Sequence, residues 1–265
     1  MAAVNRSIAH NTFIYSSDDL NVLLGGLWVA EGITNANLYS MMEIICIFSD
    51  TFDLQHHRGP LVERDNSQLQ PGDYFVVTNG SITVTDDEVP LLRTVSPEGL
   101  PKSKMPAQSF VNAVRYRDRH CVLTGQPVPG ASYDDWCSFD AVPIFPLAYE
   151  AYWNDFGFGK WITVPPATKS DGSINSPQNG ILLNATAHAF FHSYLVSINP
   201  DDNYKIVCFS PSAARFGMAG GHIKRIFIDH PLRPADQLLR WHFRQTVLVN
   251  MKGAGEFFFD TDADC

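Results

Sequence analysis

Two histidines near the middle of the second half of the chain have the type and spacing of a pair that serves one chemical centre. His188 and His192 are four residues apart, and on an α-helix this spacing puts both side chains on one face. Imidazole titrates near neutral pH and also binds zinc, so the pair can transfer protons or hold a metal. Each histidine alone is equally consistent with a packed core position or a helix-terminal cation.

Aromatic side chains are concentrated just upstream of these histidines, between residues 136 and 161. Core packing is the default explanation for such a cluster, and an apolar pocket beside two imidazoles is the sharper one. The second interpretation suits an organic substrate better than a polyanion. It predicts substrate-binding roles for Trp136, Phe139, Tyr149 and Trp153.

The sequence pattern predicts the elements that must position these residues. Strands are expected over 138–145 and 180–183, and a helix over 185–193 that Asn184 can cap. Pro106 can open a helix that runs to about residue 120. A strand is expected over 121–124. The last helix, over 235–251, has an apolar stripe at four-residue spacing: Leu239, Phe243, Val247 and Met251.

The first half of the chain predicts mainly β-structure. Strands are expected over 12–16 and 21–29, followed by a helix over 34–50 capped near Thr34 or Asn35. Residues 74–78 and 81–85 are rich in β-formers and flank Asn79-Gly80, which predicts a two-residue hairpin. A loop over 96–106 is the best candidate for a boundary between two modules.

Five segments carry a resemblance to a known family: VRYRDRHCVLTG (114–125), PIFPLAYE (143–150), INSPQNGILL (174–183), SINPDDNYKIVCFSP (197–211) and RPADQLLRWHFRQTVLVNMKGAGE (233–256). They resemble a fungal family of HNH (ββα-metal) nuclease-domain proteins, and residues 11–95 are similar to the N-terminal portion of that family. The resemblance implies an α+β fold. It comprises an N-terminal β-rich module (1–100) and an HNH-like domain (101–265) that has a ββα-metal core and ends in a docking helix.

The resemblance also implies roles, and one of them is lost here. In an HNH nuclease a strand histidine deprotonates water, an asparagine orients it, and helix side chains bind a divalent metal. Pro143 stands at the place of the base, Asn179 at that of the orienting residue and His188 at that of the helix ligand. Val142 replaces a ligand found in other branches, and His192 replaces the usual Asp. Proline accepts no proton, and losing a general base costs about 10²–10⁴ in rate.

Composition and charge argue against several functions. The chain carries 19 basic and 28 acidic residues, a net charge of −9, and phosphate neutralisation dominates nucleic-acid binding, so no nucleic-acid partner is expected. Its densest basic cluster, Lys104, Arg115, Arg117 and Arg119, is interpreted as a solvated helix face. The five cysteines form no CxxC pair, which argues against a cysteine-rich zinc site. The N-terminus has no signal-peptide pattern and no apolar run is long enough for a membrane span, so a cytoplasmic location is expected.

Three hypotheses follow. The first is an HNH-like fold repurposed in secondary metabolism, in which His188, His192 and Asn179 support acid/base isomerisation or cyclisation of a small apolar organic substrate, with no metal and no cofactor. The second is a metal-dependent nuclease with a rearranged site, rescued by a neighbour such as Asp140 or Glu150. The third is a catalytically inert interaction module.

Overall fold

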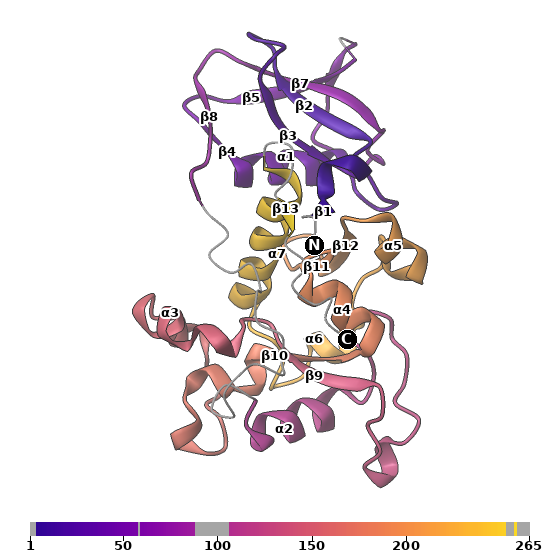
Figure 1. Ribbon diagram of the computed structural model, residues 1–265, viewed down its shortest axis with the longest axis vertical. Coiled ribbons are helices and arrows are strands. Elements are labelled where there is room, and N and C mark those ends of the chain that lie inside the picture. The colour runs from indigo at the N-terminus through magenta and orange to yellow at the C-terminus, as the bar shows by residue number, and fades with distance from the viewer. Residues whose placement is uncertain (1–3, 58, 88–105, 253–256, 259–265) are drawn as a thin grey trace.

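The computed structural model of the chain describes residues 4–57, 59–87, 106–252 and 257–258 (Figure 1). It is a mixed α and β structure, as the sequence predicts. The N-terminal sheet lies at one end, two further strands with their helices lie at the other, and a long helix runs between them. Residues 96–105 of the predicted boundary loop fall outside the described part of the chain. Within that part, no helix is both long enough and apolar enough to cross a membrane.

The N-terminal module is built on a five-stranded sheet with the order β3-β2-β7-β5-β6. Its strands are β2 (Thr12–Ser16), β3 (Leu23–Leu27), β5 (Phe52–His56), β6 (Leu61–Val62) and β7 (Gly72–Thr78). Helix α1 (Asn35–Ile45) packs beneath the sheet through fully buried side chains such as Leu38 and Met41. Thr34 and Asn37 form a reciprocal capping box at its start, which confirms the predicted cap.

The predicted hairpin at Asn79-Gly80 is wrong. Strand β7 pairs with β2 and β5, whereas β8 (Ile82–Val84) pairs with β4 (Cys46–Phe48) in a separate two-stranded sheet. The chain does not reverse at Asn79-Gly80, because β8 continues from β7 and pairs with β4 in the same register in which β7 pairs with β5. Strand β4 follows α1 at Cys46. Helix α1 is therefore also shorter than the predicted 34–50, since its last residues become this strand. The pairing of β4 with β8 explains both the absence of the hairpin and the earlier end of α1.

The second module contains a strand–strand–helix unit. Strand β9 (Phe139–Pro143) pairs antiparallel with β10 (Gly180–Asn184), with Pro143 opposite Gly180 and Phe139 opposite Asn184. Helix α4 (Ala185–His192) follows at once, and the Asn184 side chain caps it by accepting a 2.8 Å bond from the Ala187 N–H. Helix α2 (Gln108–Asp118) covers the strands. The segment over 121–124, predicted as a strand, is a turn.

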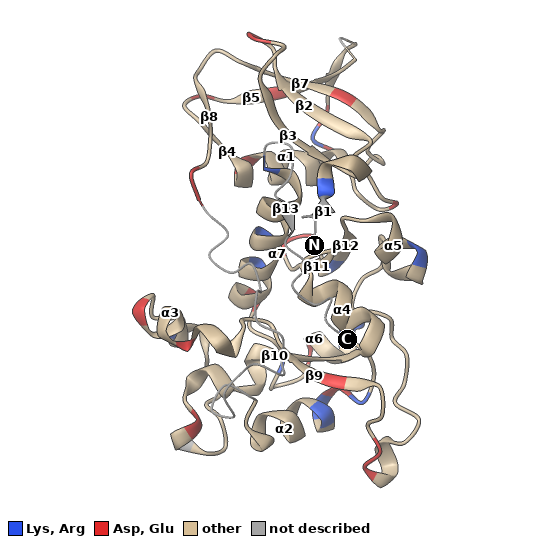
Figure 2. Cartoon of the chain, in the orientation of Figure 1, with Lys and Arg blue, Asp and Glu red and all other residues tan. Residues whose placement is uncertain are grey.

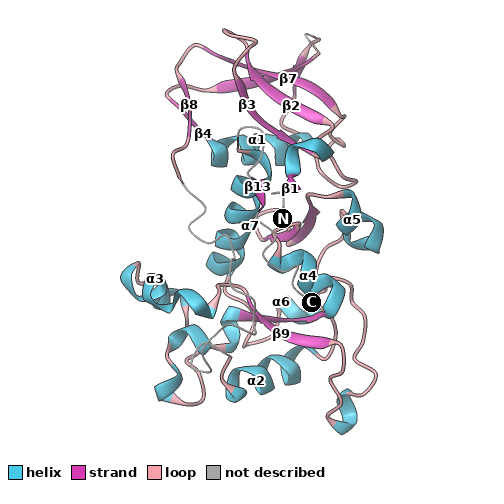
Figure 3. Cartoon of the chain, in the orientation of Figure 1, coloured by secondary structure: helices cyan, strands magenta, loops and turns pink. Residues whose placement is uncertain are grey.

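Helix α7 (Asp236–Met251) joins the two modules, as Figure 3 shows. It packs against β11 (Val196–Asn199), α1 and β3, and its predicted apolar stripe is buried. The sequence pattern missed β11, which pairs with β12 (Lys205–Cys208). The remaining short elements are β1 (Val4–Asn5), η1 (Arg6–Ala9), η4 (Ala131–Tyr133), η5 (Leu147–Tyr149), α3 (Glu150–Asp155), η6 (Phe158–Trp161), η7 (Lys169–Asp171), η8 (Ser173–Asn175), η9 (Pro177–Asn179), α5 (Pro211–Ala213), η10 (Ala214–Met218), α6 (Arg225–Ile228) and β13 (Phe257–Phe258).

Two glycines touch where the modules meet. Both Gly32, at φ +84°, and Gly220, at φ +69°, adopt the left-handed backbone conformation that glycine favours. A Cβ on Gly32 would lie 2.2 Å from the Cα of Gly220, closer than side-chain contacts allow. The seam is therefore backbone against backbone at this point.

A buried ion pair holds the second module together. Arg117 is 7% exposed, and its guanidinium bonds twice to Asp118, its neighbour on α2. The same guanidinium donates to the carbonyls of Pro177, Leu232 and Gly180 at 2.7–2.8 Å. The interpretation of Arg117 as part of a solvated helix face is thus wrong. Its charge is paired inside the protein and its donors are shared among four residues.

Removing this arginine should destabilise the protein strongly. Arg117→Met keeps the apolar stem but leaves the buried Asp118 carboxylate unpaired, and breaking a buried pair in this way costs about 3–5 kcal/mol. Arg117→Lys should lose most of the same free energy, because an ammonium point charge cannot reproduce the planar fork. Urea denaturation followed by circular dichroism measures the free energy of unfolding.

The matched control is Arg225→Met. Arg225 pairs with Asp229 at 3.1 Å, but the two side chains are 77% and 58% exposed. An exposed pair of this kind contributes less than about 1 kcal/mol. Equal losses in the Arg117 and Arg225 variants would contradict the structural role assigned to Arg117.

Candidate functional site

An aspartate–histidine pair lies on the strand–strand–helix unit. The Nδ1 atom of His188, on α4, is 2.9 Å from the Oδ2 atom of Asp140, on β9. Their side chains are 32% and 55% exposed, so the pair is open to solvent. Asp140 and Val142 share one face of β9, because side chains alternate along a strand. The Asp140 carboxylate thus lies two residues before Val142, the position where the resemblance implies a ligand.

Electrostatics favour the ionised form of Asp140. The hydrogen bond from His188 is the largest favourable influence, and it holds the pKa of this carboxyl below its usual value of 3.8 although partial burial acts in the opposite direction. The positive charge of Arg115 on α2 lowers the pKa further. Sequence reasoning named Asp140 only as a possible rescuing neighbour and overlooked Arg115 as its electrostatic partner. Glu150, the other named neighbour, lies exposed at the start of α3.

His192 lies one helical turn beyond His188, as their spacing predicts. The ring centroids are 6.0 Å apart and the ring planes are nearly perpendicular, at 78°. Both residues are only partly buried. The structure therefore brings the two imidazoles to one face of α4, with Asp140 in contact with the first of them.

Pro143 and Asn179 lie at the other end of the strand pair. Asn179 is fully buried, and its amide bonds only to backbone. It accepts from the Phe145 N–H at 2.8 Å and donates to the carbonyls of Phe145 and Ile174 at 3.1 and 2.9 Å. In this conformation Asn179 fixes the course of the chain after β9 and orients no imidazole.

The four aromatic residues expected to bind substrate have different surroundings in the described structure. Phe139 and Trp153 are core residues, 4% and 1% exposed, and Trp153 packs edge-on against Phe145. Tyr149 is partly buried beside them. Trp136 borders an open groove. Several rings of residues 145–161 pack against one another around Phe145.

No preformed metal centre is visible among the described residues. They contain no group of three or more His, Cys, Asp or Glu side chains placed to hold an ion. Cys121 is buried and Cys137 is exposed, and neither joins the two histidines in such a group. Asp140, His188 and His192 are nevertheless the right donor types for zinc, and the two histidines would be the ligands.

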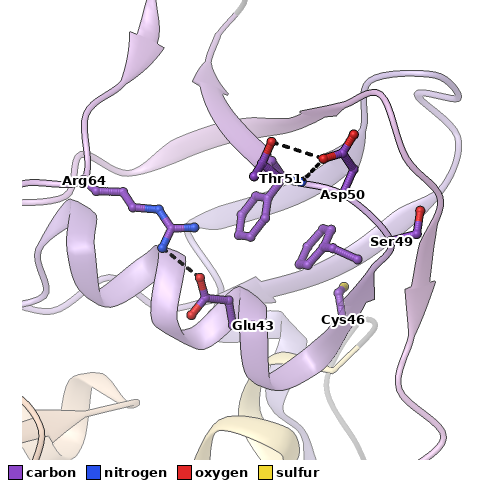
Figure 4. Close-up of a pocket in the computed structure, with 8 residues that line it drawn as sticks. Glu43, Cys46, Ser49, Asp50, Thr51 and Arg64 are labelled. Atoms are coloured by element: carbon purple, nitrogen blue, oxygen red, sulfur yellow. Dashed lines mark hydrogen bonds and ion pairs between the residues drawn. The ribbon is translucent and has the colours of Figure 1, made fainter.

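The N-terminal module has a separate open pocket of about 750 Å³. Figure 4 shows Arg64 directed at Glu43 on one rim, with Asp50 and Thr51 on the other, over two stacked phenylalanines. Burial raises the pKa of the Cys46 thiol at its base to about 12. This thiol therefore stays protonated and is no nucleophile.

Comparison with known protein families supports the resemblance of the second module to HNH domains. Residues 121–199 match a family model described as HNH endonuclease, and residues 9–83 match one described as a domain of unknown function (DUF8573). No curated protein and no solved structure matches the chain. The HNH match contains β9, β10 and α4, and hence the Asp140–His188 pair. This part of the chain is thus similar to HNH endonucleases.

The lowered pKa of Asp140 has a measurable consequence for stability. A carboxyl whose pKa is depressed on folding stabilises the protein above its unfolded pKa, and this contribution is lost as the pH falls through the folded value. The difference in unfolding free energy between the wild type and Asp140→Asn should therefore be larger at about pH 5.5 than at about pH 3, since it shrinks as the pH falls below 3.8. Exposure limits it to less than about 1 kcal/mol. Urea denaturation at both pH values measures it.

Asp155→Asn is the control, because Asp155 is an exposed residue at the end of α3. This variant should track the wild type at both pH values. An Asp140→Asn difference that is the same at both pH values would contradict the assignment of an ionised, paired carboxylate.

Proposed function

We propose that the second module is an HNH-like domain that no longer cleaves nucleic acid. In this proposal the Asp140–His188 pair transfers protons in an isomerisation or cyclisation of a small organic substrate. The observation that carries the proposal is the 2.9 Å contact between Asp140 and His188, combined with proline at the position of the former base.

The former base position has no chemistry to offer. Pro143 ends β9 opposite Gly180, and its side chain neither accepts nor donates a proton. Val142 beside it is 2% exposed and apolar, so it cannot act as a ligand. A nuclease that has lost both its base and this ligand lacks the means to activate water and to stabilise the developing charge.

The Asp140–His188 contact gives His188 a defined tautomer. An ionised carboxylate only accepts hydrogen bonds, so Nδ1 of His188 must donate. In the neutral ring the lone pair then lies on Nε2, the nitrogen that the carboxylate leaves free. This is the arrangement in which a carboxylate orients an imidazole as a general base. His192, on the same face of α4, is the group best placed to return a proton.

A metal-dependent nuclease is the second candidate, and two observations favour it. Residues 121–199 match the HNH endonuclease model, and the ring centroids of His188 and His192 lie 6.0 Å apart on one helix face. Asp140 would then be the carboxylate that orients a ligating imidazole. The two candidates make opposite predictions about nucleic acid.

The nuclease test separates them. We expect no cleavage of supercoiled plasmid or single-stranded DNA above background with Mg²⁺, Mn²⁺ or Zn²⁺, because no residue replaces the base at position 143. Gel electrophoresis measures nicking, and elemental analysis of protein purified without a His-tag measures bound metal. Nicking that requires metal and disappears in His188→Ala would establish the second candidate instead.

The acid/base test uses the mass balance of the reaction. Isomerisation and cyclisation conserve mass, so a strain of the source organism that carries His188→Gln should lose one metabolite and accumulate an isomer of identical mass. Removing a general base lowers the rate by about 10²–10⁴, so the block should be nearly complete. Asp140→Asn should give a weaker form of the same phenotype. Liquid chromatography with mass spectrometry measures both.

The Asp155→Asn strain is the control and should match the wild type. Unchanged metabolites in His188→Gln, with the variant protein folded and present at normal levels, would reject the acid/base function and leave an inert interaction module.

A further inference from the structure

A groove runs along α2. Its volume is about 680 Å³, and its lining includes Arg115 and Tyr116 on α2, Arg119 directly after the helix, and Ser132, Asp134 and Trp136 from the segment before β9. Figure 2 shows basic positions at the end of α2 that lies below β9. The groove adjoins the pair through Arg115, whose charge acts on the Asp140 carboxyl.

Arg115 is held in place with a donor to spare. Its guanidinium carbon lies 5.2 Å from the centre of the Trp136 ring, and the Trp136 indole N–H is fixed by a 2.6 Å bond to Asp134. The Nε atom of Arg115 is buried, and no acceptor within the described residues bonds to it. A buried arginine N–H without an acceptor costs free energy, and a ligand oxygen that accepts from it after a small shift of Arg115 would relieve that cost.

Arg119 supplies a second positive charge. It ends α2 in the left-handed conformation, at φ 54°, with its N–H bonded to the Arg115 carbonyl at 3.1 Å. Its side chain is exposed and borders the groove. Tyr116 beside it is 79% exposed, an unusual position for a large aromatic side chain. Aromatic faces and two guanidinium groups thus line one groove.

We propose that this groove binds the carboxylate of a small aromatic or otherwise planar organic acid. The guanidinium fork matches a carboxylate in geometry and charge, and Trp136 and Tyr116 offer surfaces for a planar ligand. A polyanion fits less well, because Asp134 lies within the groove, Asp140 lies beside it and the chain carries a net charge of −9. A single anionic group meets the arginines with less of this repulsion than a polyanion does.

The inference rests on the proposed function in one respect, since it names the substrate class for the Asp140–His188 pair. A carboxylate held at Arg115 would place the rest of the acid next to the residue whose charge Arg115 already influences. Binding at the groove is measurable without any turnover, so the two proposals can fail separately.

The experiment is a titration of the full-length protein with benzoate, followed by calorimetry and by the NMR signal of the Trp136 indole N–H. Trp136→Phe identifies that signal. Benzamide, the uncharged analogue, and inorganic phosphate are titrated in parallel. We expect saturable benzoate binding that shifts the Trp136 signal, and no binding of benzamide.

Variants locate the site. Arg115→Gln should weaken benzoate binding at least tenfold, and Arg119→Gln should weaken it less. Arg225→Gln removes an equally positive, exposed charge that does not line the groove, and His188→Gln removes the proposed base. Both of these should bind benzoate as the wild type does.

Three outcomes overturn the inference: no saturable benzoate binding, binding unchanged in Arg115→Gln, or phosphate binding that displaces benzoate at lower concentration. If benzoate binds as expected while the His188→Gln strain shows normal metabolites, the groove assignment stands and the acid/base function fails. Normal benzoate affinity in a folded Arg115→Gln protein rejects the groove whatever the metabolites show.

Discussion

The second module depends on the buried charge of Arg117. Its five N–H groups meet the Asp118 carboxylate and three backbone carbonyls, while Asp118 also accepts from the Leu182 N–H on β10 at 2.8 Å. One ion pair thus connects α2 to the start and the middle of β10 and to the chain before α7. The positions of β10 and α4, and therefore of His188, follow from it. A charge buried in this way is tolerated only because every donor is satisfied.

Local sequence signals predicted the elements of the site well, but they did not predict strand pairing or which polar side chain is buried. Asn184 caps α4 as its side chain predicts, and the i, i+4 spacing places His188 and His192 on one face. Arg117 was assigned to the surface because spacing along a helix does not say which polar residue turns inward. The Asn79-Gly80 signal predicted a hairpin turn, whereas the chain continues from β7 into β8, whose partner is β4. Strand partners are set by the whole fold, which short windows do not contain.

The surroundings expected for the two histidines differ from the observed ones for the same reason, because tertiary packing decides which side chains meet. Composition predicted aromatic surroundings for the histidines, and the aromatic residues are indeed close in sequence. They pack against each other around Phe145, however, and the histidines face solvent with a carboxylate and an arginine nearby. The charged site is thus open to solvent, and the aromatic rings form a separate apolar core. Rings that are fully buried avoid water more completely than rings that border a polar site.

The contact of Gly32 with Gly220 bears on how the two modules can change over time. At this contact the two modules meet through backbone atoms, so the fit does not depend on a matched pair of side chains. Substitutions elsewhere on one module can accumulate without a compensating change here, provided that both glycines remain. A Cβ at Gly32 would force the two modules apart, and a Cβ at Gly220 would make a tight contact on a backbone conformation that favours glycine. The contact thus tolerates substitutions in the surrounding surfaces but not at the two glycines.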